Sequence, residues 1–298
     1  MFCFQCQEAL NNSGCTVRGV CGKKEETADL QDALVYVCKG MSLLSRQLQK
    51  SAGRRGDEEG RFVVRALFAT ITNANFDNDR FAELIREALA HNRRLRAELG
   101  AEAEDLPAPA TWDADSVAEF YARVPEASVL TEEDADARSL KELTIYGLKG
   151  IAAYAEHALI LGYEDEAIYN HLLEALASSV EESEIDPLLA MTLKTGEVAV
   201  KTMELLDRAN TETYGHPEIT TVDLGVGDRP GILVSGHDLK DLEELLKQSN
   251  GVGVDIYTHG EMLPAQYYPA FKTYDHFKGN YGNSWWKQGE EFEKFNGA

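Results

Sequence analysis

Residues 27–50, TADLQDALVYVCKGMSLLSRQLQK, carry the pattern that decides the fold of this chain. Apolar side chains recur there at steps of three and four residues, at Leu30, Leu34, Val37, Met41, Leu44 and Leu48. Because an α-helix turns once in about 3.6 residues, this spacing gathers the apolar side chains on one face. The pattern predicts a helix from about Glu25 onward. Thr27, which precedes Asp29, is a candidate cap for its start.

The same periodicity returns along the chain and predicts a mainly α-helical protein. An acidic stretch with two prolines, residues 101–116, divides the helical patterns into two sets. Pro187 falls in a first turn, where proline suits a helix. We therefore expect two three-helix bundles joined by a loop and a short helix. The further expected helices span 61–76, 77–99, 116–123, 136–162, 165–181 and 186–210.

The pattern changes after residue 210, where short β-branched runs alternate with glycine and proline. GILVSG predicts a buried strand at 231–235, HDLKDLEELLKQ predicts a helix, and VGVDIYTHG predicts a second strand at 253–258. Strand, helix and strand in this order form a βαβ unit with a parallel, Rossmann-like sheet. Helical and aromatic segments are expected in PAFKTYDHF and SWWKQGEEFEKF. Two strands and one helix leave this α/β domain incomplete.

These patterns predict three parts: a cysteine-rich cap at 1–24, a helical domain at 25–212 and a truncated α/β domain at 213–298. The formal net charge of −22 argues against nucleic acid as a partner, because an acidic surface repels phosphates. No apolar run approaches the ~20 residues that a membrane-spanning helix needs. The N-terminus lacks the features of a secretory signal, so we expect a cytoplasmic protein with reduced thiols.

Four of the five cysteines lie within the first 21 residues, with the spacing C-x2-C-x8-C-x5-C. They are Cys3, Cys6, Cys15 and Cys21. Four thiolates suit either a zinc ion or an iron–sulfur cluster. A zinc ribbon would more often show two CxxC pairs, so the compact spacing favours iron–sulfur. Zinc and unrelated thiols remain open. Cys38 lies inside the first predicted helix and is expected to pack in the core.

The segments around these cysteines, MFCFQCQEA, GCTVRGVCGK and ETADLQDALVYV, closely resemble the start of the hybrid cluster proteins, also called prismane proteins or hydroxylamine reductases. The resemblance covers essentially the whole chain. The other segments that carry it are LFATITNANFD, RSLKELTIYGLKGIAAYAEHA, EALAS, TYGHPEIT, PGILVSGHDLKDLEELLKQ, GVDIYTHGEMLPAQYYPAFK and GNYGNSWWKQ.

The resemblance implies that the four N-terminal cysteines hold a [4Fe–4S] cluster in a helical domain of two three-helix bundles, with two α/β domains after it. It also implies a second centre, a hybrid iron–sulfur–oxygen cluster where hydroxylamine or nitric oxide is reduced. His237 and Glu261 match two ligands of that cluster. Each follows a predicted strand, and the ends of neighbouring parallel strands commonly form a site. Imidazole and carboxylate both suit iron.

Without the resemblance, His237 would be interpreted as the neighbour of a helix cap. Asp238 is a candidate for that cap or for a group behind the metal ligands. His259 could line the site, but it is expected simply to end the second strand.

The chain departs from the family pattern in one respect. The remaining hybrid-cluster ligands of the family are several cysteines and a further glutamate in the later α/β domains, whereas this chain has no cysteine after Cys38. The catalytic centre is therefore not expected to assemble on this chain alone. The sequence is interpreted as a fragment of a longer reading frame, a piece of a split gene or a truncated recombinant form, with a true short protein as the remaining alternative.

Two functions follow from these observations. The first is an oxidoreductase that receives electrons at its N-terminal cluster from a reduced carrier protein and reduces hydroxylamine to ammonia, or reduces nitric oxide. The alternative is a non-catalytic iron–sulfur module for electron transfer. Neither function involves nucleic acid or a membrane.

Overall fold

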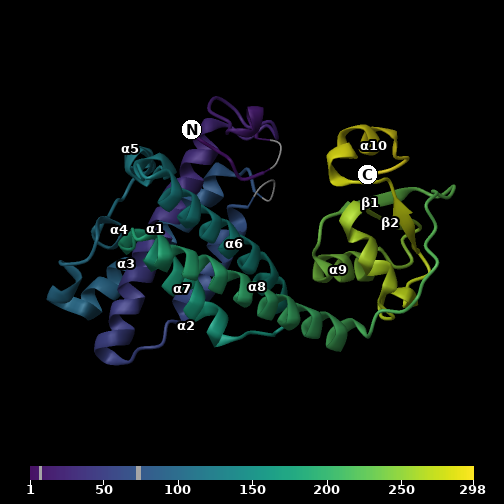
Figure 1. The fold of residues 1–298 in the computed structure, drawn as a ribbon. Coiled ribbons are helices and arrows are strands. Elements are labelled where there is room, and N and C mark those ends of the chain that lie inside the picture. The colour runs from purple at the N-terminus through teal and green to yellow at the C-terminus, as the bar shows by residue number, and fades with distance from the viewer. Residues whose placement is uncertain (7–8, 72–74) are drawn as a thin grey trace. The chain divides into compact units, whose positions relative to one another are not determined.

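The computed structural model describes residues 1–6, 9–71 and 75–298, and most of them lie in helices (Figure 1). The α-helices are α1 (Glu25–Ala52), α2 (Asp57–Ala69), α3 (Asn78–Leu99), α4 (Ala108–Thr111), α5 (Val117–Ala127), α6 (Ala135–Ile160), α7 (Glu166–Glu181), α8 (Ile185–Tyr214), α9 (Leu239–Ser249) and α10 (Gln288–Lys294). The 3₁₀ helices are η1 (Leu10–Asn12), η2 (Gly100–Ala103), η3 (Val129–Thr131), η4 (Gly260–Tyr267), η5 (Phe271–Thr273) and η6 (Trp285–Lys287). The strands are β1 (Gly231–Ser235), β2 (Asp255–His259) and β3 (Phe277–Tyr281).

Helix α1 is the centre of the helical part, where it packs against α3, α4, α5 and α7. Its Leu34, Val37 and Cys38 side chains are fully buried, which confirms core packing for this cysteine. A helix that is buried on most of its faces belongs in the middle of a bundle. Gly40 makes the contact with α4 possible, because a Cβ atom there would lie 2.0 Å from the carbonyl oxygen of Pro109.

The helix starts differ in part from the expectations. Thr27 does not cap α1, which already begins at Glu25, and its hydroxyl instead donates to Asn78 Oδ1 at 2.7 Å. The helix begins at Glu25, as predicted, and the cap prediction was wrong because Thr27 lies inside its first turn. Helix α2 runs from Asp57 to Ala69, so the prediction of 61–76 placed it too late, and Thr70 and Ile71 are not helical. Residues 72–74 of that prediction lie outside the described residues.

The chain forms two compact units, each described here by itself. The first comprises 1–156 and 164–204, and the second comprises 157–163 and 205–298. In the first unit, Thr144 of α6 and Thr192 of α8 share a hydrogen bond of 2.9 Å. His171 of α7 is hydrogen-bonded to Thr195 of α8 at the same distance. Helix α8 therefore contacts both α6 and α7. The predicted limits of the three parts stay predictions.

The second unit is built on a parallel sheet of three strands in the order β1, β2, β3. Leu242 and Leu246 of α9 pack into its core together with Tyr214, Ile256, Met262, Ala265, Tyr268 and Phe271. Strands β1 and β2 and helix α9 confirm the βαβ prediction. Strand β3 was not expected, because FKGNY has no clear alternation and contains residues that are poor in strands. The fold class, mainly α with a partial parallel α/β domain, is confirmed.

No described helix is both long enough and apolar enough to cross a membrane.

We expect Gly40→Ala to lower the free energy of unfolding by roughly 2–3 kcal/mol, since the added carbon would push α4 away from α1. Gly196→Ala in α8 is the matched control, because a Cβ there meets nothing within 4 Å. It should raise the free energy of unfolding by up to about 1 kcal/mol through helix propensity. Urea denaturation followed by circular dichroism measures both. Equal midpoints for Gly40→Ala and the wild type would contradict the close contact.

His171 predicts a pH dependence of stability. Burial lowers its pKa from 6.5 to about 4, and repulsion from Lys194 adds to this effect. Between pH 6.5 and 4 the unfolded chain therefore binds a proton that the folded chain does not. The free energy of unfolding should fall by about 3 kcal/mol through this group as the pH drops across that window. His171→Gln should remove this component in urea denaturation at several pH values, whereas the exposed His216→Gln should keep it. Parallel pH profiles for wild type and His171→Gln would refute it.

Candidate functional site

The N-terminal cap brings Cys3 and Cys15 side by side. The Cys3 amide donates to the Cys15 carbonyl at 3.0 Å, and the Cys15 amide donates back at 2.8 Å. Cys21 lies in a turn closed by the Gly19 amide, which donates to the Lys23 carbonyl at 2.8 Å. A Cβ atom on Gly19 would lie 3.0 Å from the Cys21 sulfur, so this glycine leaves room for the thiol. Backbone pairing thus organises the loop that carries the predicted ligands.

The cap does not show a complete ligand cage. Cys15 is buried, Cys21 is exposed, and Cys3 and Cys6 are half-buried. Among the residues that the structure describes, no group of three or more His, Cys, Asp or Glu side chains is arranged to hold a metal ion. The four-cysteine ligand set therefore stays a prediction.

Lys23 is a buried charge beside these thiols. It is only 1% exposed, and its ammonium donates to Gln31 Oε1 at 2.7 Å. Within the described part of the chain, no carboxylate reaches it at ion-pair distance. Gln31 is equally buried, and because its oxygen faces Lys23, its Nε2 donor points elsewhere and has no hydrogen-bond partner among the described residues. A buried charge without a counter-charge is costly, so this arrangement calls for an anion.

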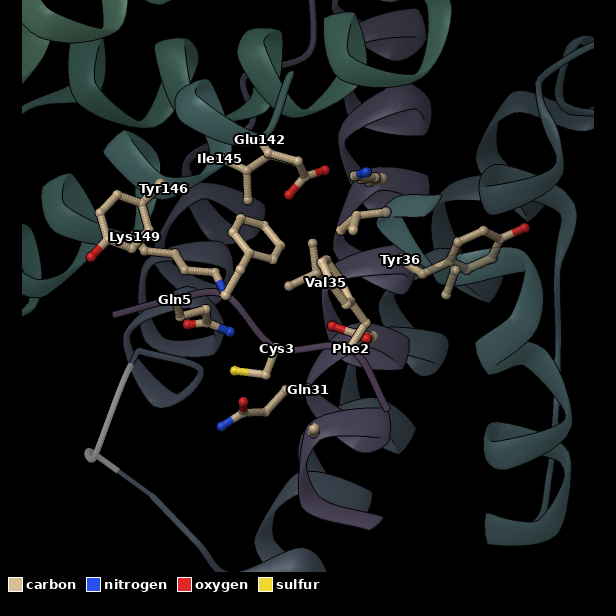
Figure 2. A pocket seen from close by; sticks show the side chains of 16 residues that line it. Phe2, Cys3, Gln5, Gln31, Val35, Tyr36, Glu142, Ile145, Tyr146 and Lys149 are labelled. Carbon is tan, nitrogen blue, oxygen red and sulfur yellow. The ribbon is translucent and has the colours of Figure 1, made fainter. Parts of the chain in front are cut away.

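A small cavity of about 40 Å³ adjoins the cap, with Cys3, Gln31 and Lys149 around it (Figure 2). Asp32 also lines it, and burial raises the pKa of this carboxyl to about 7, against the attraction of Lys149. Burial lowers the pKa of Lys149 to about 8, Asp32 opposes this shift, and repulsion from Lys23 adds to it. Lys23 thus lies close enough to Lys149 to disfavour the charge of Lys149.

This setting fits a thiolate-bound metal centre. Four thiolates give such a centre a negative charge, which two neighbouring buried ammonium groups would stabilise. The unpartnered Nε2 donor of Gln31 fits a hydrogen bond to sulfur. The cysteines, Lys23, Gln31 and Lys149 all belong to the first unit.

The second candidate site lies where β1 and β2 end. Ser235 and His259 are paired in the parallel register, and each is followed by a glycine and then by a predicted ligand, His237 or Glu261. Both glycines have positive φ, +146° for Gly236 and +54° for Gly260. Each therefore turns the chain sharply after its strand. The two ligands consequently leave neighbouring strands at the same level.

His237 and Glu261 are brought into contact, since His237 Nε2 is hydrogen-bonded to Glu261 Oε2. Both side chains are more than half exposed. Asp238 caps α9, where it accepts from the amides of Lys240 and Asp241, and this confirms the predicted cap. It also lies 3.4 Å from the His157 ring. The structure thus places an imidazole and a carboxylate together, open to solvent, at the carboxyl end of the sheet.

His259 ends β2, as predicted, and its ring is fully buried. Its Nδ1 is hydrogen-bonded to Ser235 Oγ at 3.0 Å and its Nε2 to Glu291 Oε2 at 2.9 Å. The bond to His259 is the leading cause that lowers the pKa of the Glu291 carboxyl. This chain of contacts ties the ends of β1 and β2 to α10, directly beneath the two predicted ligands.

The sequence patterns missed Lys23, Gln31, Ser235 and Glu291. Gln31 and Lys23 flank the start of α1, where a polar residue is ordinarily exposed. The only available signal was that Lys23 follows the last cap cysteine within two residues. Ser235 has the same spacing from His237 as His259 has from Glu261, and that symmetry was visible in the letters SGH and HGE.

The model of the Prismane/CO dehydrogenase family matches residues 1–298. A hydroxylamine reductase from Halothermothrix orenii is 59% identical over 307 residues, and one from Desulfosudis oleivorans is 56% identical over 301. A third, from Nitratidesulfovibrio vulgaris, is 55% identical over 306 residues. Each comparison covers 100% of this chain and 55% of the relative, so the chain spans about half the length of the curated relatives it matches. The chain belongs to the Prismane/CO dehydrogenase family.

Proposed function

We propose that this chain provides the electron-entry centre and part of the catalytic centre of a hybrid-cluster oxidoreductase that reduces hydroxylamine to ammonia. Similarity to the hydroxylamine reductases supports this function. The observation that carries it is the in-register pair of His237 and Glu261 at the ends of two parallel strands. Nitric oxide is a second substrate compatible with the same kind of centre.

The proposed entry centre is a [4Fe–4S] cluster held by Cys3, Cys6, Cys15 and Cys21. When bound, such a cluster stores and passes single electrons. The chain contributes the paired backbone of Cys3 and Cys15, which fixes these two residues beside each other, and the buried lysines, whose positive charge suits an anionic cluster. A reduced carrier protein is the proposed electron donor, and the net charge of −22 suits a basic one.

At the proposed catalytic centre, His237 and Glu261 would be two ligands of a hybrid iron–sulfur–oxygen cluster. That group supplies the electrons and Lewis acidity for breaking the N–O bond. In this structure the two side chains share a hydrogen bond, so their binding to iron would displace the proton between them. Ser235, His259 and Glu291 hold the strand ends that position both ligands. The matched relatives are nearly twice as long, and the remaining ligands are proposed to lie outside the matched part.

A second function is an iron–sulfur module that transfers electrons without catalysis. One observation favours it: all five cysteines belong to the first unit, and His237 and Glu261 alone offer too few ligands for a cluster. We propose that the chain and its electron-carrier protein both lie in the cytoplasm, where thiols are kept reduced.

Anaerobically purified chain should contain about four irons and about four sulfides. Cys15→Ala should lose most of both, because it removes a thiolate from the proposed ligand set. Cys38→Ala is the matched control: this thiol is fully buried in α1, so its loss should leave iron and sulfide unchanged. Chemical analysis and the visible absorption of the cluster measure the outcome. Bound zinc without sulfide would rule out the proposed cluster.

His237→Ala and Glu261→Ala should each reduce hydroxylamine-dependent oxidation of a low-potential dye by at least roughly 100-fold in the natural protein. Iron at the N-terminal centre should remain, since those cysteines lie in the other unit. Glu244→Gln on α9 also removes one carboxylate charge, as Glu261→Ala does, but from a partly exposed side chain of the same unit that is no predicted ligand, and should keep full activity. Full activity in Glu261→Ala would exclude it as a ligand. A natural protein that binds the first cluster but never reduces hydroxylamine would favour the electron-transfer module.

A further inference from the structure

The backbone around Lys23 is fixed on both sides, and its side chain is buried. Its carbonyl accepts from the Gly19 amide and closes the turn that carries Cys21, and α1 begins two residues later. These backbone contacts fix the point at which the side chain leaves the main chain. At 1% exposure it is among the largest fully buried side chains of the molecule. Its charge is consequently held inside the cap, next to the predicted ligands.

The groups around Lys23 do not neutralise it. Gln31 Oε1 accepts one of the three ammonium hydrogens, but an amide carries no net charge. Lys149 is close enough to repel it. Asp32 attracts it through space, yet burial holds the pKa of this carboxyl near 7, so Asp32 is only partly ionised at neutral pH. Among the described groups near Cys3, three lysines (Lys23, Lys39 and Lys149) face two carboxyls, Asp32 and Glu142, and burial raises the pKa of both carboxyls. These groups leave an excess of positive charge around Cys3.

Gln31 supplies a second observation. Its contact with Lys23 identifies the amide oxygen, because an ammonium group only donates hydrogen bonds and must face an acceptor. The Nε2 group is buried and has no hydrogen-bond partner among the described residues, a rare and costly state for a donor. A buried excess charge and a buried unused donor, both beside the thiols, fit the same missing group: an anion with acceptor sulfurs.

We propose that Lys23 is the counter-charge of the N-terminal iron–sulfur cluster and that Lys23 and Gln31 together set its reduction potential. The inference rests on the proposed cluster but not on the proposed substrate. Reduction adds a negative charge to the cluster, and a nearby ammonium stabilises the reduced form more than the oxidised form. An N–H donor to sulfur acts in the same direction. Lys23 is thus a positioning residue that acts through charge, without binding iron.

The test is a redox titration of the anaerobically reconstituted chain, followed by electron paramagnetic resonance. Lys23→Met should lower the equilibrium constant for reduction at least tenfold, which corresponds to about 59 mV for one electron. Lys23→Arg should recover most of this shift, because it restores the charge. Gln31→Met should produce a smaller shift of the same sign. Lys24→Met is the matched control, since the neighbouring lysine is exposed and loses the same charge.

Iron and sulfide analysis separates the two proposals. A wild-type chain without a cluster would defeat the proposed function and this inference with it. A Lys23→Met chain with the wild-type cluster content and potential would overturn the inference alone. Loss of the cluster in Lys23→Met, with an unchanged helical circular dichroism spectrum and a full cluster in Lys24→Met, would support a counter-charge required for assembly. If Lys23→Met does not fold, an unshifted potential in Gln31→Met would overturn the inference.

Discussion

The burial of helix α1 is the constraint on which the helical unit depends. The helix packs against α3, α4, α5 and α7, and its apolar residues are buried around most of its circumference. The same helix carries Gln31 and Asp32 near its start, so the cap chemistry rests on the helix at the centre of the unit. The Gln31 side chain is only 1% exposed and is not solvated. Its hydrogen-bond partners must therefore come from the cap, so the packing of α1 also determines which groups the cap can bind.

In the second unit, strand register positions the candidate ligands. Ser235 pairs with His259 at the ends of two strands, and a glycine with positive φ follows each of them. His237 and Glu261 therefore follow the two strands at equivalent positions. A shift of one residue in either strand would send one of the two side chains to the other face of the sheet. The hydrogen bond between Ser235 and His259 opposes such a shift at the critical position. Precision at this site therefore comes from the backbone, although both ligands are exposed.

Periodic apolar patterns predicted the helices and the βαβ unit well, because burial itself creates those patterns. They failed where burial does not set the structure. Strand β3 is held by backbone pairing to β2 and by Asp223, whose carbonyl accepts from the Asn280 amide at 2.9 Å, and backbone groups leave no trace in sequence. His237 and Glu261 could be named through a family resemblance and the rule for strand ends. The burial of Lys23 could not, because a lysine beside a helix start is ordinarily solvated.

The two candidate sites prepare for a metal in opposite ways. In the cap, Lys23 and Lys149 are buried cations, and in the described part of the chain no carboxylate lies at ion-pair distance from either, so an anionic centre would offset their charge. At the sheet, His237 and Glu261 already satisfy each other by a hydrogen bond, so a metal must first displace a proton. The cap should therefore gain stability when its centre forms, whereas the sheet site should depend on further ligands to outweigh the bond it loses. This asymmetry agrees with the two proposed centres, one for electron entry held by residues 1–24 and one for catalysis that takes ligands in addition to His237 and Glu261.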